Sequence, residues 1–366
     1  MNGSPGKVLV AMSGGVDSSV AALLLQQQGY ECCGVTMDLV ERSLLDDGSG
    51  NVASSKCCSL DDFKDATEVS MRLGIPHDVI NMKEEFGRLV VEPFVAEYRA
   101  GRTPNPCIEC NRHLKFDLLL ELADKLGCMH IATGHYARIW NDGSRFHLSR
   151  GLDEGKDQAY VLHMLTQEQL ARTLFPLGDL PKEKVRAIAK EHGFSNAGKR
   201  DSEDICFIPD GDYAAFIERF TGKPNEPGDV LDLAGEVIGH HRGAACYTIG
   251  QRKGLGVALG QPAYVCDKDM AANTVTLGPR EALMSSGCTA GGFNWIWEEP
   301  SVGESMRCEV KTFYRQQPFA AELVNLGDGN ARIVYEEPHQ KAVPGQTVVA
   351  YDGDDVIGGG TIESWF

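Results

Sequence analysis

The stretch that most constrains this chain is Ser-Gly-Gly-Val-Asp-Ser-Ser (residues 13–19), which directly follows the apolar residues 8–12. An uninterrupted apolar run is typical of a buried parallel strand. The glycine pair can take positive φ, which lets backbone N–H groups approach an anion. Residues 18–28 have helical apolar spacing and are closed by Gly29, so a helix N-terminus points at the same anion. The sequence therefore predicts a phosphate-binding turn between the first strand and the first helix.

Two common phosphate motifs do not match this stretch. No lysine follows the glycines, as the Gly-Lys-Ser/Thr ending of a P-loop requires, and the G-x-G-x-x-G dinucleotide pattern is missing too. The signature after the first strand instead resembles the PP-loop of the ATP pyrophosphatase superfamily. That resemblance implies cleavage of ATP between its α- and β-phosphates and adenylation of a substrate. The alternative reading is a strand-to-helix turn without a ligand.

Size, charge and cysteine content narrow the class of protein. The 366 residues, 42% of them hydrophobic, suffice for two or three domains with buried cores. The formal net charge of −17 excludes a broad basic face, so contact with nucleic acid needs a local patch. Twelve cysteines without a secretory leader predict reduced thiols. No apolar run could span a bilayer, so we expect a cytoplasmic protein without a membrane partner.

Three further apolar runs predict the rest of a doubly wound parallel sheet. They lie at residues 32–37, 78–82 and 129–133; a polar loop at 41–56 and a helix beginning at Ser59 follow the first of them. Ligands bind at the carboxyl ends of such strands. Met37 and the pair Gly134-His135 stand at those ends, so we expect them near a nucleotide or substrate. A core methionine and a structural histidine are the alternatives.

Cysteines stand in two distinctive segments. Thr-Pro-Asn-Pro-Cys-Ile-Glu-Cys-Asn (residues 103–111) contains two prolines that stiffen the backbone just before a predicted helix. A cysteine at a helix N-terminus has its thiolate stabilised, which favours Cys107 and Cys110 as reactive thiols. Cys206 follows a basic pair among acidic residues, and its local composition alone favours a buried, inert thiol.

The sequence changes character beyond about residue 209, where Gly and Pro become frequent and short apolar runs predict β-strands. Two basic, glycine-flanked segments at 239–243 and 249–254 are predicted to be loops that touch phosphate or face water. Strict alternation after residue 288 predicts a small antiparallel barrel. We therefore expect an α/β catalytic domain at 1–208, a β-rich central domain at 209–285 and a C-terminal antiparallel β-barrel at 286–366.

Six motifs, in this order, resemble those of one family of tRNA-modifying enzymes. They are the residues at 13–18, 103–111, 133–136 (Thr-Gly-His-Tyr), 156–158 (Lys-Asp-Gln), 202–207 (Ser-Glu-Asp-Ile-Cys-Phe) and 248–255 (Thr-Ile-Gly-Gln-Arg-Lys-Gly-Leu). From Val8 almost to the C-terminus the chain resembles the MnmA family of bacterial tRNA-specific 2-thiouridylases. The resemblance implies that ATP adenylates the 2-carbonyl of the wobble uridine of tRNA and that sulfur then displaces AMP. The products would be 2-thiouridine, AMP and pyrophosphate.

The same resemblance implies binding residues. For ATP, with Mg²⁺ shielding its phosphates, they are Ala11, Met12, Ser13, Gly14, Gly15, Val16, Asp17, Ser18, Met37 and Gly134. For tRNA they are Asn105, Pro106, Cys107, His135, Lys156, Asp157, Gln158, Tyr314, Arg315 and Gln346. The target uridine must leave its stack to react, which suits the anticodon loop.

The resemblance also implies catalytic residues and reverses the reading of Cys206 as inert. Cys110 becomes the nucleophile and Cys206 the carrier of a persulfide received from a sulfur-relay or cysteine desulfurase partner. Asp17 becomes a catalytic residue that orients the metal. The cycle ends in a Cys110–Cys206 disulfide that an external reductant must open.

Cys107 departs from part of the family, because some members have Asp at this position. It forms a Cys-x-x-Cys pair with Cys110, which opens a second mechanism. In that mechanism Cys107, Cys110 and Cys206 bind a [4Fe–4S] cluster that delivers sulfide. We favour the persulfide mechanism. Two other classes stay open, a different adenylating PP-loop enzyme and a non-catalytic RNA-binding module on a nucleotide-binding scaffold; the two thiols and Asp17 argue against both.

Overall fold

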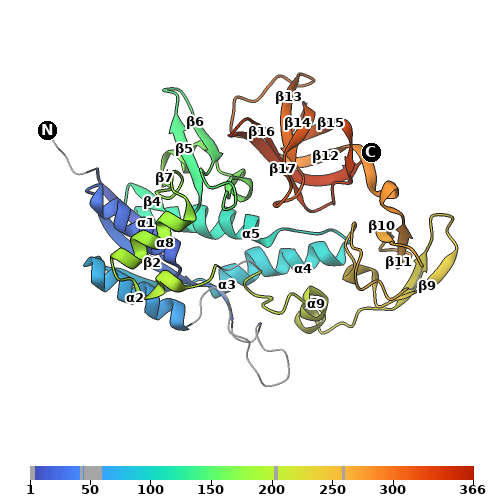
Figure 1. Cartoon of the computed structure of the whole chain (residues 1–366), viewed down its shortest axis with the longest axis horizontal. Helices are drawn as coiled ribbons and strands as arrows, with labels where there is room; N and C mark the ends of the chain where they lie inside the picture. The colour runs from blue at the N-terminus through green and yellow to red at the C-terminus, as the bar shows by residue number, and fades with distance from the viewer. Residues whose placement is uncertain (1–4, 42–43, 45–59, 202–204, 258–259) are drawn as a thin grey trace. The chain divides into compact units, whose positions relative to one another are not determined.

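The structure is a computed structural model that describes residues 5–41, 44, 60–201, 205–257 and 260–366 (Figure 1). The chain forms two compact units. The first comprises Met1–Val90, Pro106–Gly211 and Gly353–Ile357, and the second comprises Val91–Asn105, Asp212–Asp352 and Gly358–Phe366. Most of the predicted polar loop at 41–56 and the predicted helix start at Ser59 lie outside the described residues.

A five-stranded parallel sheet organises the first unit. Its order is β3-β2-β1-β4-β7, with β1 at Lys7–Ala11, β2 at Glu31–Asp38, β3 at His77–Asn81, β4 at His130–Ala132 and β7 at Thr173–Leu174. The first strand is central, since Val8 pairs with Cys32 on one side and His130 on the other. The predicted strands are confirmed, with each end shifted by one residue. The first unit also holds the hairpin of β5 (Ala137–Asn141) and β6 (Phe146–Arg150).

The helices of the first unit include the one predicted after the first strand, with different ends, and one at Gln167–Ala171 that the sequence did not predict. They are α1 Val16–Gln27, α2 Leu60–Leu73, α3 Lys83–Phe86, α5 Pro106–Glu109, α6 Leu119–Lys125, α7 Gln167–Ala171 and α8 Lys182–Glu191. Two π-helical segments, η2 (Gly87–Val91) and η3 (Cys110–Leu118), continue α3 and α5. The first helix begins at Val16, two residues before the predicted start, which brings Asp17 into its first turn.

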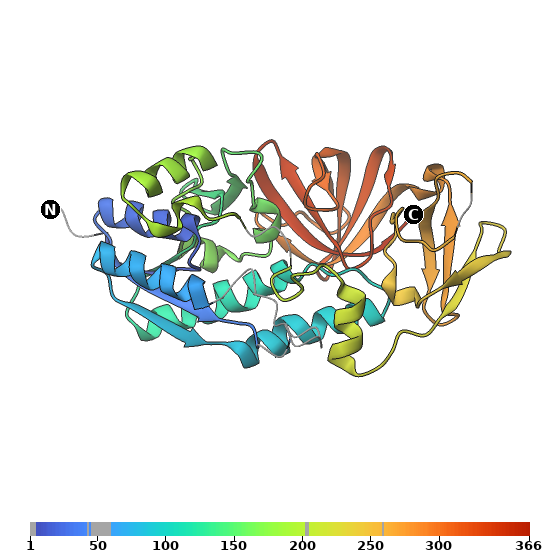
Figure 2. The same cartoon turned by 60° about the horizontal axis from the view of Figure 1, so that its bottom comes forward.

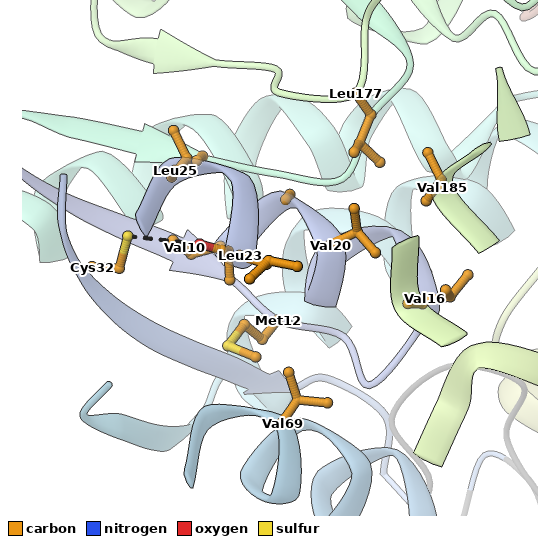
Figure 3. Packing of buried hydrophobic residues seen from close by; sticks show 14 of the residues in the cluster. Val10, Met12, Val16, Val20, Leu23, Leu25, Cys32, Val69, Leu177 and Val185 are labelled. Carbon is orange, nitrogen blue, oxygen red and sulfur yellow. Dashed lines mark hydrogen bonds between the residues drawn. The ribbon is translucent and has the colours of Figure 1, made fainter. Parts of the chain in front are cut away.

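Apolar residues cover the sheet on both faces. Val10 and Met12 belong to a buried cluster with Val20 and Leu23 of α1 and with Val185 of α8 (Figure 3). Val8 belongs to the same cluster. Leu9 lies between Val8 and Val10 in the strand and is 1% exposed, so the opposite face is buried as well. A parallel sheet buried on both faces is the doubly wound architecture that the sequence predicted.

The second unit opens with two helices and a small mixed sheet. They are α4 (Glu92–Arg99) and α9 (Tyr213–Thr221), and the sheet has the order β10-β11-β8-β9. Its strands are β8 Gly228–Leu231, β9 Val237–His241, β10 Tyr264–Asp269 and β11 Thr274–Gly278. The prediction of a loop at 239–243 is wrong for residues 239–241, which belong to β9. Helix α9 was also missed; Asp212 caps it by accepting from the N–H of Ala215.

Six antiparallel strands close into the predicted C-terminal barrel (Figures 1 and 2). They are β12 Met284–Trp295, β13 Ser305–Lys311, β14 Phe319–Gly327, β15 Asn330–Gln340, β16 Thr347–Asp352 and β17 Asp355–Trp365. The order β12-β15-β14-β13-β16-β17 is closed by pairing of β12 with β17. Alternating burial along β14 is the pattern of a strand with one face in a core.

Candidate active site

Glycine and serine shape the turn after β1. Gly14 has a φ of +73°, and a Cβ atom there would lie 2.2 Å from the carbonyl oxygen of Asp62. Only glycine fits such a position. The hydroxyl of Ser18 donates to the carbonyl of Gly15 and accepts from the N–H of Ser13, both at 3.1 Å. Gly15 itself has a φ of −81°, so the second glycine of the pair does not use positive φ.

The carboxyl end of β4 lies against the N-terminus of α1. A Cβ atom at Gly134 would lie 2.7 Å from the backbone nitrogen of Ser18 and 2.9 Å from the carbonyl carbon of Asp17. The sheet therefore brings Gly134 to the turn, as the strand order requires. The N-terminus of α1 carries a positive partial charge, and the first N–H groups of a helix have no intrahelical acceptor. Both properties favour binding of an anion at this end of the helix. Met37, at the end of β2, is 9% exposed.

Asp17 is held by two residues that the sequence had not linked to it. The phenolic hydroxyl of Tyr136 donates to Oδ1 of Asp17 at 2.7 Å. The ammonium of Lys182, at the start of α8, donates to both carboxylate oxygens of Asp17 at 2.8 and 2.7 Å. Burial, together with the charge of Asp17, raises the pKa of Tyr136 and keeps it a hydrogen-bond donor. Lys182 is 9% exposed, so its charge faces these groups more than water.

A second carboxylate, Asp201, extends this network. It pairs with Lys182 at 2.8 Å, with Lys156 at 2.7 Å and with Arg186 at 2.8 Å. Burial raises the pKa of Asp201, but the bonds from Lys156 and Lys182 outweigh it and lower the pKa to about 2. Lys182 is thus shared between two carboxylates, Asp17 and Asp201, and links the first turn of α1 to the residues after α8.

Asn196 and Lys199 brace the turn from the other side. Nδ2 of Asn196 donates to the carbonyl of Gly14 at 3.0 Å and to the hydroxyl of Ser19 at 2.9 Å. Lys199 donates to Asp62 and to Asp65, both at 2.6 Å. Burial lowers the pKa of Lys199, whereas those two carboxylates raise it more strongly, so the residue stays charged. No local pattern around Asn196 or Lys199 predicts that these residues contact the turn.

The candidate thiols lie on helical and turn backbone. Cys107 is exposed in the first turn of α5, and Cys110 is partly buried where α5 becomes the π-helical η3. The expectation that both thiols precede the helix is therefore corrected: the helix begins at Pro106. Asn111 anchors this point by donating to the carbonyl of Val161 at 2.9 Å. π-Helical turns occur disproportionately at functional sites.

Cys206 lies in a turn just after residues 202–204, which are outside the described part of the chain. Its neighbour Phe207 is 1% exposed and meets Phe86 edge to face, with ring centroids 5.6 Å apart. The ten cysteines that the structure describes are all thiols. Among the described residues, no three His, Cys, Asp or Glu side chains gather in a way that could hold a metal ion, which includes the set Cys107, Cys110 and Cys206.

Residues expected at tRNA have varied surroundings. His135 is buried between Phe116 and Phe175, and its Nδ1 atom forms a hydrogen bond with the hydroxyl of Thr133 at 2.7 Å. Burial lowers the pKa of His135 well below 6.5, so the imidazole ring is neutral. Within the Lys-Asp-Gln motif, Asp157 accepts from the N–H groups of Gly151 and Ala159, and Gln158 accepts from that of Tyr136. These side chains hold the backbone of the first unit.

In the second unit the expected tRNA residues differ in exposure. Tyr314 and Arg315 are exposed after β13, and the ammonium of Lys311 lies 5.8 Å from the centre of the Tyr314 ring. Asn105 and Gln346 are partly buried. Pro106, which opens α5 in the first unit, is buried. Tyr314 and Arg315 are thus the exposed residues of this group.

The turn at residues 13–19 between β1 and α1 is called the phosphate cradle below. The parallel sheet and this cradle together define an α/β nucleotide-binding enzyme, which is extended by two β domains. Family models match in that order: a tRNA methyl transferase HUP domain at residues 6–210, a tRNA methyl transferase PRC-barrel domain at 214–279 and an aminomethyltransferase beta-barrel domain at 285–362. The chain belongs to the family of tRNA-specific 2-thiouridylases MnmA, which confirms the resemblance noted in its sequence.

Curated relatives cover nearly the whole chain. The MnmA of Geotalea uraniireducens is 48% identical over 358 residues, covering 98% of this chain and 95% of the relative. Those of Carboxydothermus hydrogenoformans and Clostridium botulinum are 46% and 45% identical, each with 98% of this chain covered and with 97% and 98% of the relative covered. A solved 4-thiouridine synthetase–RNA complex with bound ATP aligns with a TM-score of 0.36 at 16% identity. The alignment covers 57% of this chain and 46% of that one, and this similarity is too low to support a conclusion.

Proposed function

We propose that this chain is a tRNA 2-thiouridine synthase, which uses ATP to activate the 2-carbonyl of the wobble uridine and replaces its oxygen by sulfur. The observation that carries the proposal is similarity to tRNA-specific 2-thiouridylases over 98% of the chain, at 45–48% identity. The phosphate cradle and the two candidate thiols supply the groups that such a reaction needs. The carbonyl oxygen is a poor leaving group until it is adenylated, which is why ATP is required.

The turn at residues 13–19 is held in one shape by close packing. Gly14 and Gly134 stand where a Cβ atom would collide with the backbone of Asp62 and of residues 17 and 18, so the glycines let these segments lie against the turn. The N–H groups at the start of α1 and the ammonium of Lys182 would bind phosphate oxygens, and these donors stabilise the negative charge that develops on the departing pyrophosphate. Lys182 would have to share its bonds between Asp17 and the ligand.

The predicted metal role of Asp17 does not fit this arrangement. Both carboxylate oxygens of Asp17 accept from Lys182, and the described residues offer no cluster of metal ligands. We therefore derive no step through Mg²⁺. The same holds for the iron–sulfur alternative, since Cys107, Cys110 and Cys206 do not form a ligand set. An iron count on anaerobically purified, active protein tests that alternative, and stoichiometric iron would revive it.

The thiols would carry the second half-reaction. A persulfide on Cys206, received from a sulfur-relay or cysteine desulfurase protein, loses its proton, attacks C2 of the activated uridine and expels AMP. The thiolate of Cys110 then attacks the Sγ of Cys206, which releases 2-thiouridine and leaves a Cys110–Cys206 disulfide. A dithiol reductant returns both thiols. Such a cycle requires a reducing compartment, in line with the cytoplasmic location that we propose.

The experiment incubates the protein with ATP, a persulfide donor and unmodified tRNA, and measures 2-thiouridine by mass spectrometry and pyrophosphate release in parallel. We predict that Cys110→Ser and Cys206→Ser each abolish 2-thiouridine while leaving tRNA-stimulated pyrophosphate release in place. Cys308→Ser is the control, because burial raises the pKa of Cys308 to about 12 and makes it a poor nucleophile.

Other outcomes point to the rival functions. Full thiolation by the double Cys110/Cys206 variant would contradict the proposed chemistry. Pyrophosphate release that tRNA does not stimulate would favour another adenylating enzyme, and no release at all would favour a binding module.

For tRNA contact we propose Tyr314 and Arg315 of the barrel and the segment at Asn105, Pro106 and Cys107. The domain joins at 208/209 and 285/286 also stay predictions. No described helix is long and apolar enough to cross a membrane.

A further inference from the structure

The loop between β13 and β14 contains a tight turn that lies wholly within the second unit. The N–H of Gln316 donates to the carbonyl of Phe313 at 3.2 Å, so residues 313–316 form a hydrogen-bonded β-turn. Tyr314 and Arg315 occupy the two central positions of this turn, and both are exposed. The residues proposed to contact tRNA in the barrel therefore stand at the corner of one turn.

The side chain of Gln316 ties this turn to the residue that follows β13. Its Oε1 atom accepts from the N–H of Thr312 at 2.6 Å and from the hydroxyl of Thr312 at 3.0 Å. Thr312 is 2% exposed, so the turn is attached to a buried residue. Many β-turns are open, because a single backbone hydrogen bond adds little net stability. The two bonds from Thr312 therefore close the turn a second time.

Both ends of the loop are fixed to the barrel. Lys311 pairs with Val349 of β16. At the other end, the ring of Phe319 stacks on that of His339 in β15, with ring centroids 3.8 Å apart and an interplanar angle of 13°. Movement in this loop is thus confined to the residues between these two ends, and the bonds of Gln316 restrict the part that carries the turn.

The turn offers side chains that suit an unpaired stretch of RNA. Residues 311–319 contain two cations, Lys311 and Arg315, and no acidic residue, in a chain with a formal net charge of −17. Tyr314 is 36% exposed, and an exposed aromatic ring can stack on an unpaired base while a neighbouring guanidinium pairs with phosphate. On a chain that repels polyanions overall, such contacts contribute most when they are held in place beforehand, because ordering a loop on binding costs affinity.

We propose that Gln316 is a positioning residue for tRNA binding: its bonds with Thr312 hold the β-turn in the conformation in which Tyr314 and Arg315 contact the RNA. The inference rests on the proposed function, which assigns tRNA contact to these two residues. Gln316 itself needs no contact with the RNA. Its effect on tRNA affinity must therefore disappear when Tyr314 and Arg315 are replaced, whereas an effect of general instability would persist.

The test replaces Gln316 by Met, which keeps the length of the side chain and removes the acceptor oxygen. The matched control is Gln317→Met, because Gln317 is the next residue in the same loop and is exposed. One measurement needs no RNA: the rate at which trypsin cleaves the bond after Arg315 in the folded protein, followed by peptide mass spectrometry. The others are the tRNA dissociation constant by fluorescence anisotropy, thiolation at saturating tRNA and thermal unfolding.

We expect Gln316→Met to speed cleavage after Arg315 about tenfold, because an ordered turn must open before a protease can bind it. The dissociation constant for tRNA should rise about five- to tenfold. Thiolation at saturating tRNA should stay within about twofold, as should every value for Gln317→Met. Thr312→Val loses the hydroxyl bond and keeps the backbone bond, so its cleavage rate and tRNA affinity should fall between those of wild type and Gln316→Met.

A double-mutant comparison separates positioning from stability. The variant Tyr314→Ala/Arg315→Gln should itself bind tRNA more weakly than wild type. Adding Gln316→Met to it should change the dissociation constant by less than about twofold, because the residues through which Gln316 acts are gone.

Unchanged cleavage and tRNA affinity in Gln316→Met would overturn the proposal. An equal loss in Gln317→Met would overturn it too, since any change in the loop would then act alike, and so would a full further loss in the Tyr314→Ala/Arg315→Gln variant. Wild-type tRNA affinity in that variant would also overturn it, because the turn would then not contact RNA. A wild-type protein that binds tRNA but forms no 2-thiouridine would instead contradict the proposed function, and the tRNA affinities would still decide the role of Gln316.

Discussion

Lys182 is the residue on which the charge balance of the candidate site depends most. Its ammonium is 9% exposed and bonds the carboxylates of both Asp17 and Asp201. Removing it would leave two carboxylates without their shared cation, and a buried charge without a partner costs more than the pair contributes. Lys182 therefore serves stability and, in the proposed function, phosphate binding at the same time.

We predict that Lys182→Met lowers the stability of the first unit by about 1–3 kcal/mol and slows pyrophosphate release about a hundredfold. Lys184→Met is the control, because Lys184 is an exposed residue in the first turn of the same helix. The double variant Lys182→Met/Asp17→Asn separates the two effects. It should regain stability, since one uncompensated charge is gone, but not activity. Normal pyrophosphate release by Lys182→Met would show that this lysine is not needed for the nucleotide.

The limits of prediction at this scale are set by sequence distance. The cradle at residues 13–19 and Gly134 could be predicted because each follows a recognisable apolar strand, and strand order brings such ends together. The partners of Asp17 could not, since Lys182 lies 165 positions away and its surroundings read as an ordinary solvated helix start. Asn196 was missed for the same reason: an amide that bonds a carbonyl 182 residues distant leaves no local pattern.

At the scale of elements, the pattern of apolar residues predicts most of the strands that pack into the core of the first unit. The strands at 7–11, 31–38 and 130–132 are largely buried apolar runs, so their type followed from the sequence, whereas their order in the sheet was not predicted. Helix α9 was missed because it sits in a region rich in Gly and Pro. The start of α5 was misplaced because Pro106 was read as a loop residue, although proline is well suited to the first position of a helix.

The turn between β1 and α1 allows a prediction with a built-in control. Gly14→Ala should destabilise the first unit, because alanine at a φ of +73° costs about 1–2 kcal/mol and its Cβ would also strike the backbone of Asp62. Gly15→Ala should cost far less, since φ there is −81° and the nearest atom to a Cβ is 3.4 Å away. Thermal unfolding of the two variants measures the difference. Equal destabilisation would contradict the geometry of the turn described above.

At the scale of the whole molecule, the net charge of −17 restricts how a polyanion is bound. Long-range attraction cannot hold tRNA on such a chain, so the proposed contact must come from few cations, such as Arg315, and from the shape of the anticodon loop. Salt weakens nucleic-acid binding in proportion to the number of phosphates that cations neutralise, with a slope of about −0.7 to −0.9 for each. The logarithm of the tRNA association constant should therefore fall with the logarithm of the salt concentration with a slope of about −2 to −3.

Fluorescence anisotropy with labelled tRNA between about 50 and 200 mM salt measures this slope. Replacing Arg315 by Gln should reduce its magnitude by about one, because one phosphate contact is lost. Lys64→Gln should leave the slope unchanged, because Lys64 is a 77% exposed residue on α2 that pairs with Asp61. A slope steeper than about −6 would reveal a broad electrostatic footprint. In that case local cations on an otherwise repelling surface would not account for binding, and the interface would have to be sought beyond Tyr314 and Arg315.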